Sequence, residues 1–173
     1  IPKISEWTTV EGSGNGDNTT HTAYVVFDRD GDYTLDISCT DTAENANDEV
    51  GYGSSVAPKA FTIDKSAPVV KVTYDNNNVL NGNYYKAQRI ATITVTEHNF
   101  ETSRVKIALS ATDNGVAKAL PAVSNWKSNG DVHTATITYA ADSRYVFDFD
   151  YIDKAGNATA DMAEQIFYVD KTN

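Results

Sequence analysis

Cysteine occurs once in this 173-residue chain, at Cys39, so no disulfide can form within it. Proline is scarce as well, with four residues beside ten glycines, and the chain is therefore not a low-complexity tail. Basic residues are few, since 14 lysines and arginines face 24 aspartates and glutamates and leave a net charge of −10. Such an acidic surface repels phosphate groups, and we expect neither nucleic acid nor an anionic membrane as a partner.

No long apolar run, signal peptide or lipidation motif is visible, and we expect no membrane insertion. No nucleophile elbow, HExxH motif or Cys/His pair in a known context occurs either. We therefore expect no enzyme activity, no catalytic residues and no cofactor. The first residue is Ile1, which is not an initiator, so we expect the chain to be a piece of a longer protein.

What the chain does contain is an internal repeat. Residues 21–41 read HTAYVVFDRDGDYTLDISCTD, and residues 133–153 read HTATITYAADSRYVFDFDYID. Each block leads to a short strand that ends in Asp-Lys, FTIDK at 61–65 and FYVDK at 167–171. A repeat of this kind indicates tandem copies of one structural module.

Apolar residues alternate with polar ones through both copies, as in a strand with one buried face. The apolar series is Tyr33, Leu35, Ile37 and Cys39 in the first copy and Tyr145, Phe147, Phe149 and Tyr151 in the second. Turn-rich segments such as DRDGD (28–32) separate the strands. We expect Cys39 to be a buried, inert side chain.

These patterns predict an all-β protein made of tandem immunoglobulin-like β-sandwiches. Residues 67–173 supply about seven short strands at the spacing of a complete sandwich. Residues 1–66 match only its C-terminal half. Tyr33 and Tyr145 each stand behind a tight turn, where a tyrosine corner would bond its hydroxyl to nearby backbone.

The first copy is incomplete. Trp126 aligns with Trp7, but only six residues precede Trp7, so the counterparts of the first three strands are missing. We expect both tryptophans to have structural, packing roles. The half-sandwich would expose an apolar face that includes Phe61, and we expect a second chain or an upstream segment to cover it.

One loop contains alternating carboxylates, Asp28, Asp30 and Asp32, which resemble the start of a calcium loop. The loop lacks the downstream bidentate glutamate, and the second copy has Ala140 and Arg144 in place of two of the aspartates. Solvated surface carboxylates are the competing interpretation.

Three tyrosines are candidates for partner binding. Tyr84 and Tyr168 should face away from the buried Tyr85 and Phe167, and Tyr52 lies in a long loop of the first copy. Tyrosine is an effective interface anchor. Singly exposed tyrosines are also ordinary on protein surfaces.

The stretch NYYKAQRIATITVTEHNF (83–100), the DKAGN hairpin (153–157) and the FYVDK end together resemble a bacterial Ig-like repeat. Such repeats occur in large cell-wall-anchored proteins of Gram-positive, often gut-dwelling, bacteria. The resemblance covers 67–173 and the second half of the unit in 1–66, where DTAEN (41–45) departs from the usual hairpin. It implies a secreted protein displayed on the bacterial surface.

Repeats of this family serve as stalks and as adhesive modules, and some similar proteins bind host immunoglobulin in the manner of superantigens. The resemblance thus implies a protein-binding module for host immunoglobulin or another host glycoprotein. A passive stalk and a glycan-binding accessory domain are the alternatives. A fold alone does not decide among them.

Overall fold

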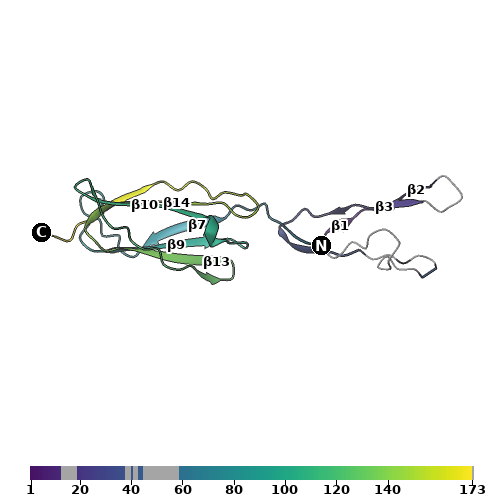
Figure 1. Cartoon of the computed structure of the whole chain (residues 1–173), viewed down its shortest axis with the longest axis horizontal. Coiled ribbons are helices and arrows are strands. Elements are labelled where there is room, and N and C mark those ends of the chain that lie inside the picture. Colours follow the sequence, from purple (N-terminus) through teal and green to yellow (C-terminus); the bar gives the residue numbers. More distant parts are fainter. Residues whose placement is uncertain (13–18, 38–39, 41–42, 45–58, 173) are drawn as a thin grey trace. The chain divides into compact units, whose positions relative to one another are not determined.

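The computed structural model describes residues 1–12, 19–37, 40, 43–44 and 59–172, and within them the protein is all-β. The one helical element of these residues is a 3-10 turn, η1 (Thr102–Arg104). None of the described residues belongs to a helix long and apolar enough to cross a membrane. The chain forms two compact units, unit 1 (Ile1–Lys65) and unit 2 (Ser66–Asn173), which are described separately (Figure 1).

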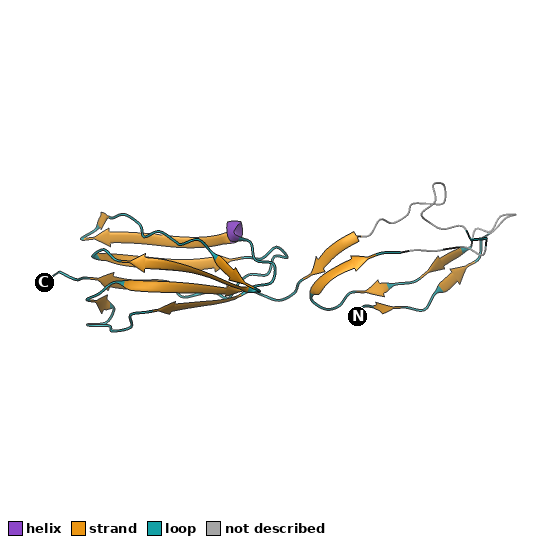
Figure 2. Ribbon diagram, turned by 90° about the horizontal axis from the view of Figure 1, so that it is seen from below, coloured by secondary structure: helices purple, strands orange, loops and turns teal. Residues whose placement is uncertain are grey.

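Unit 2 contains two sheets with a core between them, in a sandwich-like arrangement (Figure 2). The first has the order β11-β10-β14-β15-β8 and the second β12-β13-β9-β7. All neighbours are antiparallel except β15 and β8, which run parallel. The strands are β7 (Val69–Tyr74), β8 (Tyr84–Tyr85), β9 (Arg89–Thr96), β10 (Val105–Asp113), β11 (Val116–Ala117), β12 (Lys127–Asn129), β13 (Val132–Tyr139), β14 (Ser143–Tyr151) and β15 (Gln165–Val169).

The core of unit 2 follows the alternation in the sequence. Every second side chain of β14 is buried, and after Ser143 these are the predicted Tyr145, Phe147, Phe149 and Tyr151. Ile93 of β9 and Ile137 of β13 face them from the other sheet and are fully buried. The period-two pattern is therefore confirmed as the signal that separates the core from the surface.

The described residues of unit 1 form three strand pairs, β1 with β4, β2 with β3, and β5 with β6. The strands are β1 (Lys3–Ile4), β2 (Thr8–Val10), β3 (Thr20–Thr22), β4 (Val25–Val26), β5 (Gly31–Leu35) and β6 (Lys59–Ile63). The sequence repeat aligns β2 and β3 with β12 and β13, and β5 and β6 with β14 and β15.

Unit 1 repeats individual hydrogen bonds of unit 2. Ser5 N donates to the Tyr24 carbonyl at 2.8 Å, and Tyr24 N donates back to Ser5 Oγ at 2.8 Å. In unit 2, Ser124 N donates to the Thr136 carbonyl at 2.9 Å, and Thr136 N donates to Ser124 Oγ at 2.9 Å. The structural repeat therefore extends to the side-chain level.

The turn before β5 is held as the turn before β14 is. Lys65 N donates to Asp30 Oδ1 at 3.1 Å, and Lys171 N donates to Asp142 Oδ1 at 3.2 Å. Because each lysine follows the last strand of its unit, the aspartate connects the turn to the end of that strand.

The tyrosine after each turn bonds back to it, as a tyrosine corner does. Tyr33 Oη donates to the Arg29 carbonyl at 2.8 Å, and Tyr145 Oη donates to the Ala141 carbonyl at 2.9 Å. Both bonds span four residues, so the two units bend the chain in the same way.

The two tryptophans do not share an environment. Trp126 is half-buried and lies 4.9 Å from the ring of Phe100, beside the core of unit 2. Trp7 is 67% exposed, so the packing predicted for it is not observed among the described residues of unit 1. The physical reason is that Phe100 precedes η1 in a part of the repeat for which unit 1 has no described counterpart. Cys39 lies outside the described residues.

Candidate functional site

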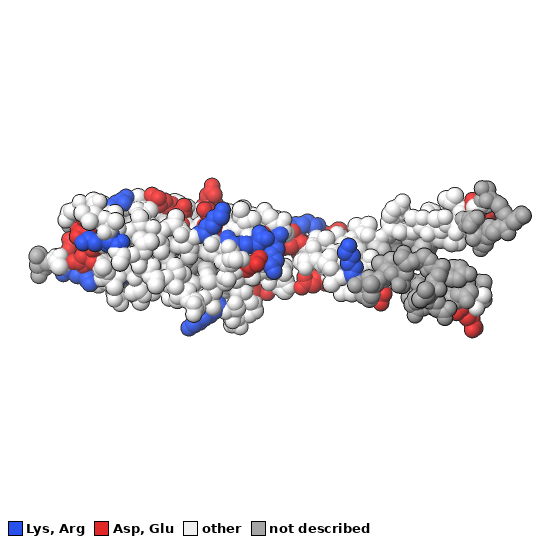
Figure 3. Space-filling view, in the orientation of Figure 1, with Lys and Arg blue, Asp and Glu red and all other residues white. Residues whose placement is uncertain are grey.

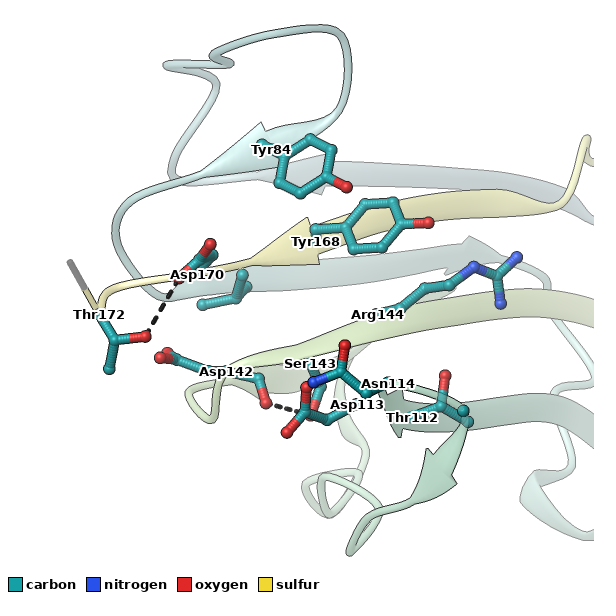
Figure 4. Close-up of a pocket in the computed structure, with 12 residues that line it drawn as sticks. Tyr84, Thr112, Asp113, Asn114, Asp142, Ser143, Arg144, Tyr168, Asp170 and Thr172 are labelled. Carbon is teal, nitrogen blue, oxygen red and sulfur yellow. Dashed lines mark hydrogen bonds between the residues drawn. The ribbon is translucent and has the colours of Figure 1, made fainter.

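Two of the predicted tyrosines meet on the outer face of the five-stranded sheet of unit 2. Tyr84 of β8 and Tyr168 of β15 pair across the parallel strands, and their rings stack with centroids 4.3 Å apart and planes 6° from parallel (Figure 4). Tyr84 is 40% exposed, while the next residue, Tyr85, is buried. Phe167, next to Tyr168, is also buried. The alternation predicted for both pairs is thus observed.

A tight turn places Tyr84 beside β15. Asn81 and Gly82 have φ values of 46° and 83°, a left-handed conformation that asparagine and glycine adopt readily. Asn83 then bonds to β15 twice. Its carbonyl accepts from Tyr168 N at 2.9 Å, and its Nδ2 donates to the Ile166 carbonyl at 2.9 Å. One backbone bond and one side-chain bond of Asn83 to β15 therefore hold Tyr84 beside Tyr168.

The row of outward side chains continues across the sheet. Arg144 of β14 pairs with Tyr168, and Thr112 of β10 pairs with Arg144. Figure 4 shows Tyr84, Tyr168 and Arg144 extending in the same direction from three neighbouring strands. We call these three residues the tyrosine face. Ile166 and Val146 form the next row and add apolar surface beside it.

An open depression of about 770 Å³ adjoins the tyrosine face. Both tyrosines line it, together with carboxylates and amides such as Asp113, Asn114 and Asp142 (Figure 4). The surface thus combines a flat aromatic stack, one guanidinium and hydrogen-bond acceptors. On the side of unit 2 visible in Figure 3, basic and acidic side chains are interspersed.

Unit 1 has different residues at the matching positions. The counterparts of Arg144 and Tyr168 are Asp32 and Thr62, and Thr62 Oγ1 donates to Asp32 Oδ1 at 2.6 Å. The equivalent strand pairs, β14 with β15 and β5 with β6, therefore form with either an arginine and a tyrosine or an aspartate and a threonine at these positions. Because the module does not require an aromatic and basic pair here, the tyrosine face is a feature of unit 2 rather than of the repeat.

The three aspartates of the calcium motif have separate surroundings. Asp30 accepts from Lys65 N, Asp32 accepts from Thr62, and the carbonyl of Asp28 accepts from Lys65 Nζ. Among the described residues, these three carboxylates do not gather closely enough to hold one ion together. Tyr52, the remaining tyrosine candidate, lies outside the described residues.

Sequence reasoning did not single out Arg89, whose side chain is 6% exposed. Its guanidinium carbon lies 3.8 Å from the ring centre of Tyr74, 3.9 Å from that of Tyr85 and 4.7 Å from that of Phe167. Burial lowers the pKa of Arg89, and the neighbouring tyrosines oppose this shift. The sequence did contain a signal for this position. Arg89 begins a strand with alternating apolar residues and lies on the same, inward side as Ala91 and Ile93.

Comparison with protein-family models, with curated proteins and with solved structures finds no match to this chain.

Proposed function

We propose that this chain is a non-catalytic protein-binding module of tandem Ig-like repeats, displayed on a bacterial surface. Its partner would be host immunoglobulin or another host glycoprotein, bound through the tyrosine face of unit 2. The observation that carries the proposal is the exposed Tyr84–Tyr168 stack beside Arg144.

Tyrosine and arginine are enriched among the residues that dominate binding energy at protein interfaces. A tyrosine offers a large apolar ring and a polar hydroxyl while it loses only two side-chain torsions on binding. Here the two rings are already stacked on hydrogen-bonded strands, so little further ordering is needed when a partner docks. The flat outer face of a sheet suits a protein surface better than a small molecule.

The test is a titration of the chain with purified immunoglobulin and, separately, with its antigen-binding and constant fragments. Tyr84→Ala and Tyr168→Ala should each weaken binding by roughly 10- to 100-fold, the effect of removing an interface anchor. Tyr24→Ala is the matched control, because Tyr24 is an exposed tyrosine of unit 1 and does not belong to the tyrosine face. An affinity unchanged in both unit 2 variants would locate the contact elsewhere.

Two further binding experiments, a capture from serum or mucosal secretions and a titration with deglycosylated immunoglobulin, separate the alternatives. A passive stalk would retain no immunoglobulin and no other protein from serum or mucosal secretions. A glycan-binding domain would lose its ligand when the immunoglobulin is enzymatically deglycosylated. Binding that survives deglycosylation and depends on Tyr84 supports the protein-binding proposal.

A further inference from the structure

We propose that unit 1 is an acceptor for a donated polypeptide segment with the strand pattern of residues 69–96, supplied from outside this chain. The segment would add strands to unit 1 and place an arginine over the ring of Phe61, the counterpart of Phe167. The proposal rests on the comparison of the two units and is independent of the tyrosine face.

Each unit contains an aromatic trio with the same geometry. The trio of unit 1 is Phe27, Tyr33 and Phe61, and the trio of unit 2 is Tyr139, Tyr145 and Phe167. In unit 1, the first ring lies 4.9 Å from the second and 4.8 Å from the third, and the last two are 5.8 Å apart. The matching distances in unit 2 are 4.9, 4.9 and 5.7 Å. The three rings therefore adopt their arrangement with or without the rest of a sandwich.

In unit 2, a lid covers the trio. Tyr74 of β7, Tyr85 of β8 and Arg89 of β9 surround Phe167, and the Arg89 guanidinium lies over three aromatic rings. Phe167 is consequently 2% exposed, and Tyr139 is fully buried. All three strands of the lid lie within residues 69–96.

In unit 1, no described residue takes the place of this lid. Phe27, Tyr33 and Phe61 are only half-buried, although their counterparts are almost completely buried. Ile37 is 47% exposed, whereas its counterpart Phe149 is 2% exposed. The exposed apolar surface is thus the inner face of the module.

Backbone edges are open at the same places. In unit 2, β13 pairs with β12 on one edge and with β9 on the other, and β14 lies between β15 and β10. In unit 1, β3 pairs with β2, β4 with β1 and β5 with β6. Within the described residues, no strand occupies the second edge of β3, β4 or β5. An open edge beside an exposed apolar face accepts an added strand.

The residues on the acceptor edge specify what the donor must contain. The inward series of β13 is His133, Ala135, Ile137 and Tyr139, and the series in unit 1 is His21, Ala23, Val25 and Phe27. In unit 2, the four partners on β9 are Val95, Ile93, Ala91 and Arg89. Two of the four acceptor residues are identical and the others are close in shape, so the pattern R-x-A-x-I-x-V fits both units. The donor arginine would then pair with Phe27.

The experiment adds a fragment of residues 67–98, fused to a soluble carrier, to the intact chain. We expect binding in a 1:1 ratio and slower amide hydrogen exchange in residues 20–27 and 31–35. Exchange in residues 132–139 should not change, which shows that unit 2 stays folded and does not take up the fragment. Arg89→Ala in the fragment alone should weaken binding about tenfold or more, because it removes the guanidinium from the ring of Phe61.

A matched pair of variants in the intact chain locates the contact. Phe61→Asp places a charge on the inner face of β6 and should abolish binding, whereas Ala60→Asp, on the opposite and exposed face of the same strand, should not. Failure of the fragment to bind a chain whose β5 and β6 amides are measurably protected would overturn the proposal. So would a chain that dimerises by itself and loses the dimer in Phe61→Asp, because a second copy would then be the occupant.

Discussion

Units 1 and 2 share the turn that precedes β5 and β14 and differ in their cores. Both units contain the tyrosine corner and the aspartate that connects the turn to the end of the last strand. Both also contain a serine, Ser5 or Ser124, whose hydroxyl accepts a hydrogen bond from the neighbouring strand. Yet Phe147 is fully buried, while its counterpart Leu35 remains half-exposed. Local hydrogen bonds therefore form wherever their residues occur, whereas burial needs strands from the other half of the module.

This difference bears on stability, because buried apolar surface is the main favourable contribution to folding. The hydrogen bonds common to both units contribute little net free energy where water competes for them. We therefore expect unit 1 to unfold under milder conditions than unit 2, and substitutions at matched positions to measure the difference.

The largest expected effect is at the matched pair Phe147 and Leu35. Phe147→Ala opens a cavity between the sheets of unit 2 and should cost about 3–5 kcal/mol of unfolding free energy. Leu35→Ala should cost about 1 kcal/mol, since a half-exposed side chain loses less burial. Residue-resolved hydrogen exchange in denaturant measures each unit separately. Equal losses would mean that Leu35 is buried as deeply as Phe147 in solution.

Arg89 is the next test, because unit 1 has no described counterpart to it. Arg89→Ala should cost unit 2 about 2 kcal/mol, through loss of a desolvated guanidinium from the aromatic rings. Arg89→Lys should recover only part of this, because an ammonium lacks the planar group that stacks on them. Thermal unfolding provides the measurement, and Lys86→Ala, at an exposed position three residues earlier, is the control expected to change little.

The tyrosine corners allow a comparison at a single atom. Tyr145→Phe should cost about 1 kcal/mol, because it removes the buried hydroxyl that donates to the Ala141 carbonyl in a partly buried bond. Tyr33→Phe should cost about half as much, since water reaches the half-exposed site in unit 1. The two variants are compared by chemical denaturation. A larger loss in Tyr33→Phe would reverse the order of burial proposed for the two corners.

The smallest effect near neutral pH concerns Tyr139, whose place in unit 1 is taken by Phe27. The Tyr139 hydroxyl is buried and has no hydrogen-bond partner among the described residues, so removing it relieves a desolvation cost. Tyr139→Phe should therefore leave the melting temperature within a few degrees of the wild type or raise it. A clear loss of stability would show that the hydroxyl has a partner in solution.

The same buried hydroxyl should make the stability of unit 2 depend on pH in the alkaline range. Burial raises the pKa of Tyr139 and of Tyr74, since both phenols are desolvated. Above about pH 10, tyrosines of the unfolded chain ionise while these two stay neutral in the folded unit. Their contribution to stability is therefore constant below that pH and falls as the pH rises through and above it. Melting curves from pH 8 to 11 measure the fall, and Tyr139→Phe should reduce it.

Much of the fold could be predicted from residue patterns. Alternation in YVFDFDY (145–151) identified the buried face of β14 correctly, because successive side chains of a strand point to opposite sides. The same rule separated Tyr84 from Tyr85. A repeated turn before Tyr33 and Tyr145 likewise indicated two equivalent corners, since the bond involved spans only four residues.

Contacts between distant segments could not be predicted in this way. Tyr84 and Tyr168 are far apart in the chain, and their stack depends on the parallel pairing of β8 with β15. Nothing in the spacing of the two residues indicates that pairing. Trp7 shows the converse, because its alignment with Trp126 predicted packing that its own surroundings do not provide.

The amino-acid sequence by itself determined the strands, their inward faces and the repeat, because these depend on neighbours within a few residues. Only the tertiary structure decided which strands lie side by side, and with them the tyrosine face and the cover that Arg89 provides. Strand order is a long-range property, set by which apolar faces can close on each other. Unit 1 has such a face and, among its described residues, no second half to close it.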